Sequence, residues 1–264
     1  MIGAVSFKLR AENSARLPFI NGRFMHAAFF KLLAEASPDF VGFVHDELNL
    51  KPFTVSFLDP IRKIPSAKEQ WLVRGGDEFF WRVTGLNAAI MQAVMSIGIG
   101  DKIQAGALVL TVAEIRTDSI VAVNDFIAEA KTSPQITEIR FDFVSPVSFK
   151  TDKFDAPYPR PELIFTSLAD KWNQAAMPVS ADKKIIRELA AQIRLTKWQG
   201  QSKKFYLAAD RGTLAFWGNF FYDIGALSRD VQKVFVLLAR FAEFAGVGRL
   251  TSQGFGQTKV NFRH

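Results

Sequence analysis

The sequence predicts an α+β protein with two ferredoxin-like units in tandem and a glycine-rich loop near the C-terminus. Three observations support this fold class. Apolar residues alternate as in strands, or recur as in helices, along most of the chain. Their order is strand, helix, strand, strand, helix, strand, which is that of a ferredoxin-like unit, and it occurs twice. The chain has 264 residues, of which 48% are hydrophobic, enough for two domains with real cores.

The first unit is predicted to span residues 1–132. AVSFKLRA alternates as a strand should, and NGRFMHAAFFKLLAEA spaces its apolar residues as a helix does. That helical spacing is carried by Phe24, Ala28, Leu32 and Ala36. QWLVRGGDEFFWRVTGL is typical of a hairpin turning at its glycine pair. The elements expected in chain order are a strand at 4–11, a helix at 21–36, a strand at 52–60, the hairpin at 70–86, a helix at 86–99, a strand at 107–117 and a short helix at 123–132.

The second unit is predicted to span residues 135–264, after a boundary at Ser133-Pro134. Its first helix begins with Pro161, which suits a first helical turn. Its second helix can be capped by Ser228 and can end at Gly246, where a left-handed residue is favoured. That helix carries one apolar stripe, made of Val231, Val234, Phe235, Leu238, Phe241 and Ala242. The expected elements are a strand at 135–149, a helix at 160–174, strands at 202–210 and 212–225, a helix at 228–246 and a strand at 254–264.

Composition excludes several classes of protein. The chain has no cysteine, so disulfides, thiolate zinc sites and cysteine nucleophiles are excluded. The N-terminal residues form a strand pattern and lack the features of a signal peptide, and no window of 18 residues is continuously apolar. We therefore expect a cytoplasmic protein without membrane contact.

The positive charge lies in the second half of the chain. Residues 1–130 carry 13 Lys and Arg against 14 Asp and Glu, whereas residues 131–264 carry 20 against 12. This asymmetry indicates a polyanionic partner such as nucleic acid, with a merely basic soluble protein as the alternative.

Four glycines occur within the eleven residues GVGRLTSQGFG, at positions 246–256. Glycines allow several backbone N–H groups to point at one phosphate, and Arg249 in the loop would add positive charge. The alternative is a glycine-rich helix cap and turn. The loop lacks the GK[ST] of a Walker motif, and it follows a helix where a dinucleotide fingerprint follows a strand.

The pattern of this loop, together with four other segments, resembles a known family. Gly246-Val247-Gly248 and Gly254-Phe255-Gly256 fit glycine, hydrophobic, glycine, five residues, glycine, hydrophobic, glycine. In this respect, the chain resembles the Cas6 family, the CRISPR-associated endoribonucleases that process precursor guide RNA on two ferredoxin-like (RRM-like) units. The other segments that resemble the family are RFDFVSPVSF, the helix with Phe165, Ser167, Leu168, Trp172 and Asn173, the segment with Lys51, Pro52, Phe53 and Ser56, and the strand with Phe216, Gly218 and Tyr222.

The resemblance implies RNA cleavage without a metal ion or other cofactor. The 2′-hydroxyl would attack the adjacent phosphorus in line, leaving a 2′,3′-cyclic phosphate and a 5′-hydroxyl. Such a reaction needs a base, an acid and positive charge near the phosphorane. The spacing of the three histidines makes no metal cluster.

The resemblance assigns the catalytic histidine to His26, in the segment GRFMHAAF. Histidine suits acid–base work because its unperturbed pKa lies near neutrality. The alternative is a helix residue bonded to a neighbouring group. His264 is terminal, and His45 in FVHDELN has the context of a loop residue. Arg23 and Lys31 are candidate helpers, with a solvated helix face as the alternative, and the identity of the general acid stays open because some family members use a tyrosine absent from this unit.

RNA contacts are expected in the second unit, on a basic segment with an aromatic residue and on the glycine loop. The alternative for the basic segment is a solvated basic helix and hairpin. The expected partner is CRISPR repeat RNA in a precursor transcript, with a CRISPR effector complex as a further partner and either a monomer or a homodimer as the oligomeric state. A non-catalytic RNA-binding subunit of an effector complex is the alternative function. The candidate RNA-binding residues are Lys183, Lys184, Arg187, Arg194, Lys197, Trp198, Lys203, Lys204, Gly246, Gly248, Arg249, Gly254, Gly256 and Lys259.

Overall fold

The computed structural model describes residues 1–36, 51–208 and 211–264. His45 lies outside the described residues. The chain divides into two compact units, one of residues 1–120 with 252–254, the other of residues 121–251 with 255–264. The tip of the glycine loop therefore belongs to the first unit. No helix in the described part of the chain has the length and apolar character needed to cross a bilayer.

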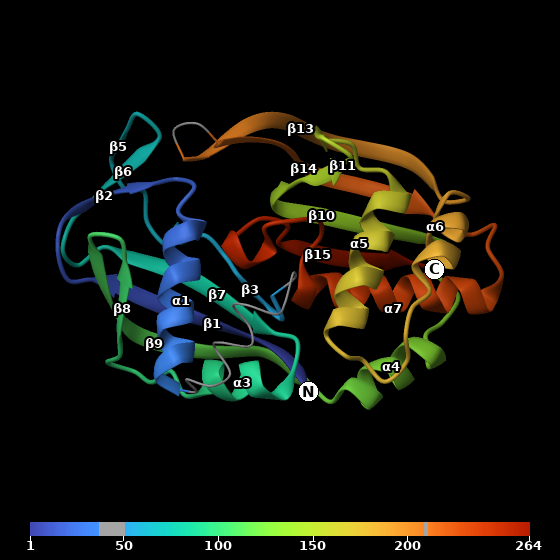
Figure 1. Ribbon diagram of the computed structural model, residues 1–264, viewed down its shortest axis with the longest axis horizontal. Helices are drawn as coiled ribbons and strands as arrows, with labels where there is room; N and C mark the ends of the chain where they lie inside the picture. The colour runs from blue at the N-terminus through green and yellow to red at the C-terminus, as the bar shows by residue number, and fades with distance from the viewer. Residues whose placement is uncertain (37–50, 209–210) are drawn as a thin grey trace. The chain divides into compact units, whose positions relative to one another are not determined.

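The first unit contains a six-stranded antiparallel sheet with two helices packed on it (Figure 1). Along the sheet the strands are ordered β3-β7-β1-β9-β8, with β4 also paired to β7. The elements of this sheet and its helices are β1 (Ile2–Ala11), α1 (Gly22–Ala36), β3 (Phe53–Val55), β4 (Asp59–Pro60), β7 (Glu78–Gly85), α3 (Ala88–Met95), β8 (Lys102–Ala105) and β9 (Leu108–Val121).

The hairpin predicted over 70–86 is wrong, because its two strands do not pair with each other, although the chain does turn between them. β6 (Gln70–Val73) pairs with β2 (Ala15–Pro18) and β5 (Ser66–Ala67) in a separate sheet, whereas β7 pairs with β1 along eight residues. The turn between them binds β1 instead, because Gly76 N donates to Ala11 O at 2.7 Å. The local sequence determined where the chain turns, whereas pairing with strands distant in sequence determined which sheet β6 and β7 each join.

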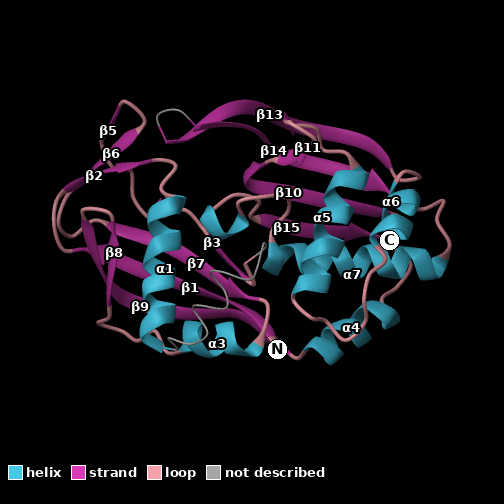
Figure 2. Cartoon of the chain, viewed as in Figure 1, coloured by secondary structure: helices cyan, strands magenta, loops and turns pink. Residues whose placement is uncertain are grey.

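The second unit repeats the arrangement with a four-stranded sheet in the order β13-β14-β10-β15 (Figure 2). The principal strands of the first unit are, in chain order, β1, β3, β7 and β9, and those of the second are β10, β13, β14 and β15. Numbered 1 to 4 within each unit, they lie in the order 2-3-1-4 in both sheets, which confirms the ferredoxin-like fold predicted for each unit. The elements are α4 (Val123–Thr132), β10 (Glu138–Val147), β11 (Phe149–Thr151), β12 (Phe154–Ala156), α5 (Pro161–Gln174), α6 (Lys183–Ala190), β13 (Arg194–Ala208), β14 (Arg211–Asp223), α7 (Arg229–Ala245) and β15 (Thr258–Arg263). A 3-10 turn at Thr251–Gln253 begins in the second unit and continues into residues 252–254 of the first.

The short helix α4 belongs to the second unit, so the division falls after Ile120 and not at Ser133-Pro134. The reason is packing. The Phe126 ring meets the Phe244 ring on α7 edge-on at 5.9 Å, and α7 also supplies Arg240 to Glu129 at 3.3 Å.

The two long helices differ in how well periodicity located their buried faces. On α7, Phe235, Leu238, Phe241 and Ala242 are buried as predicted, whereas Val234 is 40% exposed. Ser228 stands at the N-cap, but its side chain makes no capping hydrogen bond.

On α1 the buried residues are Met25, Ala28, Phe29 and Leu33, so the core face is rotated by about one residue from the expected stripe. Phe24 is 38% exposed. This rotation leaves His26 at the border of the buried face.

Candidate functional site

His26 lies on α1 between two aromatic rings of the first unit. Its imidazole is half-buried. It meets the Phe30 ring edge-on at 4.7 Å and stacks on the Phe53 ring at 5.7 Å. These rings come from the next helical turn and from β3, so the plane of the imidazole is held from two sides.

A hydrogen bond fixes which nitrogen of His26 carries the proton. Nδ1 lies 2.8 Å from the carbonyl oxygen of Ser252. A carbonyl only accepts, so Nδ1 donates, and the neutral imidazole has its lone pair on Nε2. Nε2 can therefore take a proton from a substrate hydroxyl, and the imidazolium that results can return one.

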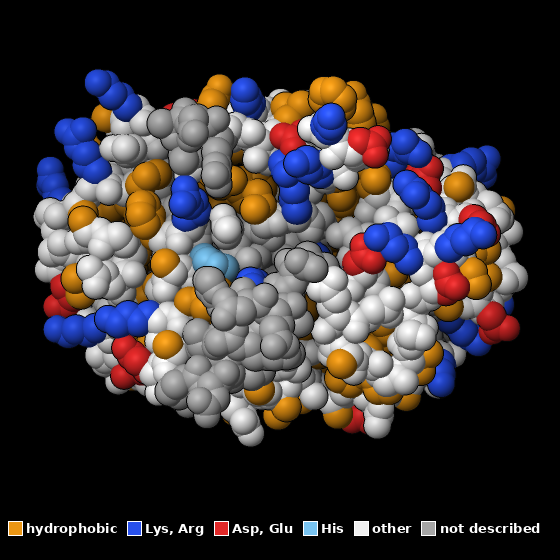
Figure 3. Space-filling model, in the orientation of Figure 1, with side chains coloured by type: hydrophobic (Ala, Val, Ile, Leu, Met, Phe, Trp, Pro, Cys, Tyr) orange, Lys and Arg blue, Asp and Glu red, His pale blue; other side chains and the backbone are white. Residues whose placement is uncertain are grey.

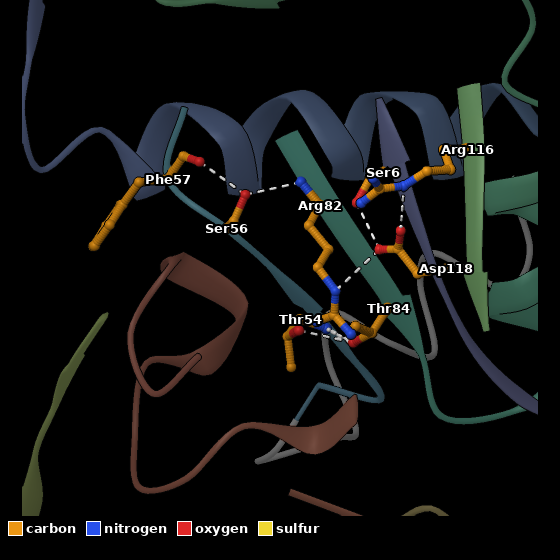
Figure 4. A network of polar contacts seen from close by, with 8 residues as sticks. All are labelled: Ser6, Thr54, Ser56, Phe57, Arg82, Thr84, Arg116 and Asp118. Atoms are coloured by element: carbon orange, nitrogen blue, oxygen red, sulfur yellow. Dashed lines mark hydrogen bonds and ion pairs between the residues drawn. The ribbon is translucent and has the colours of Figure 1, made fainter. Parts of the chain in front are cut away.

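The segment that stacks on His26 is anchored by a polar network between β3 and β7 (Figure 4). Thr54 Oγ1 lies 2.7 Å from Thr84 Oγ1. The Ser56 hydroxyl accepts from Arg82 N and donates to Phe57 O, both at 2.8 Å. Ser56 was singled out by the family resemblance, and its structural part is to hold Phe57.

The same network neutralises charge on the first sheet. Asp118 accepts from Ser6 Oγ at 2.6 Å and from Arg116 Nε at 2.9 Å, and it forms an ion pair with Arg82 at 3.4 Å (Figure 4). Arg82 and Arg116 are therefore both paired with the Asp118 carboxylate. This agrees with the lack of excess positive charge in the first half of the sequence.

Asn21 fixes the start of α1 next to the site. Its side chain is fully buried. Its Oδ1 accepts from Leu58 N at 2.8 Å and its Nδ2 donates to Leu58 O at 3.3 Å. Its own carbonyl accepts from Phe24 N at 2.9 Å. The first turn of the helix is therefore tied to the chain that follows β3.

Arg23 and Lys31 are both exposed on α1. Arg23 precedes His26 by three residues, a spacing that places both on one side of the helix, whereas Lys31 follows by five, an awkward spacing for the same face. Their catalytic roles stay predictions.

The four glycines of the loop all have positive φ, from 63° to 89°. Three of their N–H groups donate within the chain, at 2.8 to 3.1 Å: Gly246 to Ala242 O, Gly248 to Ser167 Oγ and Gly256 to Pro146 O. A Cβ on Gly256 would lie 2.1 Å from Val247 O. These glycines serve close packing of the loop backbone, and a direct phosphate contact by their N–H groups stays a prediction.

Arg249 has partners inside the second unit. Its guanidinium forms an ion pair with Asp155 and donates to Ser148 Oγ at 3.2 Å. Its backbone N–H donates to Ser148 O at 3.0 Å. Arg249 therefore ties the loop to the β10–β12 region, and its predicted contact with RNA would have to compete with Asp155.

Lys171 is a buried cation that the sequence analysis did not find. It is 4% exposed on α5. Its Nζ donates to Ala245 O at 3.1 Å, to Gly246 O at 2.8 Å and to Thr251 Oγ1 at 3.3 Å. Burial lowers the pKa of Lys171 to about 7, because its partners are dipoles and supply no full negative charge.

The basic candidates on α6, β13 and β15 are all exposed, and Trp198 is 59% exposed. Some of the charge is locally compensated, since Lys183 pairs with Asp170 at 2.6 Å and Arg194 with Asp223 at 2.7 Å. Figure 3 shows this mixture of basic and acidic side chains over the region of α5 and α6.

Exposed aromatic residues accompany this charge more widely than the sequence indicated. Lys204 Nζ lies 5.4 Å from the Tyr206 ring, which is 57% exposed. Phe154 on β12 is 77% exposed. Bases could stack on such rings.

Comparison with known proteins gives one consistent result. The family model described as CRISPR-associated endoribonuclease Cas6 matches residues 141–258. The Cas6 endoribonucleases of two Mycobacterium tuberculosis strains, CDC 1551 / Oshkosh and ATCC 25618 / H37Rv, are 28% identical over 127 residues, which is 48% of this chain and 40% of each relative. The matched part thus spans less than half the length of these curated relatives.

Solved structures match along nearly the whole chain. A product complex of a Thermus thermophilus Cas6 has a TM-score of 0.78 at 26% identity, covering 99% of this chain and 100% of that one. A second Cas6 product complex has a TM-score of 0.72 at 20% identity, with 99% and 100% coverage, and this likeness concerns the fold.

Proposed function

We propose that this chain is a member of the family of the CRISPR-associated endoribonuclease Cas6 and that it cleaves CRISPR repeat RNA in precursor transcripts to release guide RNAs. The observation that carries the proposal is the hydrogen bond from His26 Nδ1 to Ser252 O at 2.8 Å. It prepares Nε2 as a base on the helix where the resemblance places the catalytic histidine.

The proposed reaction needs no metal ion. His26 Nε2 takes the proton of a ribose 2′-hydroxyl while the 2′-oxygen attacks the adjacent phosphorus in line. The bond from phosphorus to the 5′-oxygen breaks, and that oxygen takes up a proton, for which the His26 imidazolium is the proposed donor. The products carry a 2′,3′-cyclic phosphate and a 5′-hydroxyl. Arg23 and Lys31 are proposed to stabilise the charge of the phosphorane.

The RNA is proposed to bind the second unit through phosphate contacts and stacking. Exposed cations on α6, β13 and β15 would contact the backbone. Trp198 and Tyr206 offer ring faces to unpaired bases. The same surface could retain the product, and a CRISPR effector complex is the proposed further partner.

The test uses a labelled repeat RNA from the genome that encodes this chain, incubated with protein in EDTA. A second RNA carries one 2′-deoxy nucleotide at the scissile position. We expect cleavage of the first RNA only, with a cyclic phosphate on the product. Cleavage of both would reject attack by the 2′-hydroxyl, and tight binding without cleavage would favour a non-catalytic subunit.

The RNA contacts are tested by two neighbouring substitutions on β13. Lys197→Ala is expected to lower the slope of log affinity against log salt by about 1, because one phosphate contact is lost. Trp198→Ala is expected to weaken binding about 5- to 100-fold with an unchanged slope, because stacking is lost.

Lys131→Ala, on an exposed position of α4, is the control and should change neither quantity. If both β13 variants keep the wild-type RNA affinity and salt slope, β13 is not part of the RNA interface.

A further inference from the structure

Gly22, the first residue of α1, stands where the chain has no room for a side chain. A Cβ built there would lie 1.8 Å from Gln253 O and 2.4 Å from Gln253 C. Real Cβ atoms do not approach within 3.0 Å of such neighbours. The φ of Gly22 is not among the positive values, so what requires glycine here is space and not backbone conformation.

Gln253, which approaches Gly22, is the sequence neighbour of Ser252, a hydrogen-bond partner of His26. Gln253 follows Ser252, whose carbonyl accepts from His26 Nδ1 at 2.8 Å. Both residues belong to the first unit together with α1. Moving the Gln253 backbone outward by roughly an ångström would therefore disturb this hydrogen bond, because tightly packed backbone cannot absorb the shift locally.

Gly254 adds a second close approach at the same place. A Cβ on Gly254 would lie 2.5 Å from the Phe57 ring. Phe57 is itself held through Ser56 and Arg82 N. Residues 252–254 thus pack between the Phe57 ring and the start of α1, and neither contact leaves room for a displaced loop tip.

We infer that Gly22 is a positioning residue: its missing side chain lets Gln253 approach closely enough for the Ser252 carbonyl to set the tautomer of His26. This inference rests on the proposed function for its catalytic consequence, but the tautomer can be measured without RNA. A hydrogen-bonded Nδ1 keeps the lone pair on Nε2, whereas an imidazole without that partner populates both tautomers.

The first measurement is a long-range ¹H–¹⁵N spectrum of the wild-type protein with labelled histidine, at a pH where the imidazoles are neutral. The chain has three histidines, so the signals lost in His26→Gln identify those of His26. We expect a protonated Nδ1 and an unprotonated Nε2. A wild-type His26 protonated at Nε2 would overturn the inference even if no variant could be purified.

The second measurement compares Gly22→Ala with the wild type. We expect the His26 signals to show a mixture of tautomers and the single-turnover cleavage rate to fall about 100-fold, with RNA affinity unchanged. Alanine favours a helix more than glycine does, so a weaker helix cannot explain such a loss. A wild-type tautomer in a folded Gly22→Ala, or a wild-type rate despite mixed tautomers, would also overturn the inference.

Gly98→Ala is the matched control in the same unit. Its Cβ would meet the Asp101 carboxylate no closer than 3.7 Å, an ordinary contact, so tautomer and rate should both stay as in the wild type. If the wild type itself does not cleave repeat RNA, the proposed function fails, while the spectra still decide whether Gly22 positions the imidazole.

Discussion

Replacing His26 by alanine should reduce single-turnover cleavage of repeat RNA by about 100- to 10,000-fold while leaving RNA affinity near the wild-type value. The reason is that a positioned acid–base group contributes about this much to rate, whereas its half-buried ring offers little surface for binding. Cleavage is measured with enzyme in excess, and affinity with the 2′-deoxy RNA, which cannot react.

His264→Ala is the control for the loss of a histidine. His264 is exposed at the end of the second unit, and its Nδ1 lies 3.3 Å from Gln135 O. Its removal should leave the rate unchanged. A normal rate in His26→Ala would exclude this histidine as the base, and an equal loss of affinity and rate would assign it to binding.

Sequence periodicity located α4 and α5 well because helical patterns are local, whereas α6 was not among the expected helices. α4 begins and ends at the residues predicted, 123–132, and α5 starts with Pro161 in its first turn as expected. Periodicity alone did not fix the buried face of α1, since Phe24 and Met25 are both apolar and only packing against the sheet decides between them.

Strand pairing and the function of the glycines depended on non-local contacts. The turn at Gly76 was found from its residues, but the partner of β6 is β2, more than fifty residues earlier. The spacing of Gly246, Gly248 and Gly256 located the loop, but it could not show that their N–H groups point into the protein.

Neither Ser252 nor Lys171 carried a signal in the sequence. Ser252 acts through its backbone carbonyl, which any residue could supply. Lys171 lies in a helix with other polar residues, and a lysine is almost never fully buried, so a solvated position was the natural expectation. The roles of both residues depend on contacts with parts of the chain that are distant in sequence, which only the folded structure shows.

Lys171→Met should destabilise the protein by about 2 to 5 kcal/mol near neutral pH, since it leaves buried acceptors without a donor. Those acceptors are the carbonyls of Ala245 and Gly246, at the end of α7, and the Thr251 hydroxyl. Urea unfolding of both proteins measures the difference, with Lys153→Met, at an exposed position, as the control. A stability loss no larger than that of the control would contradict this assignment.

The difference in unfolding free energy between the wild type and Lys171→Met should grow as the pH rises above neutrality. The pKa of Lys171 is about 7 in the folded protein against an ordinary value of 10.5, so between these values the unfolded chain binds more protons than the folded one. The unfolding free energy of the wild type therefore gains up to about 1.4 kcal/mol per pH unit from this group, and below pH 7 the contribution is flat because both states are protonated. Lys171→Met lacks the group and should lack this slope. Parallel pH profiles for the two proteins, measured from pH 6 to 9, would mean that the buried amine keeps its proton throughout.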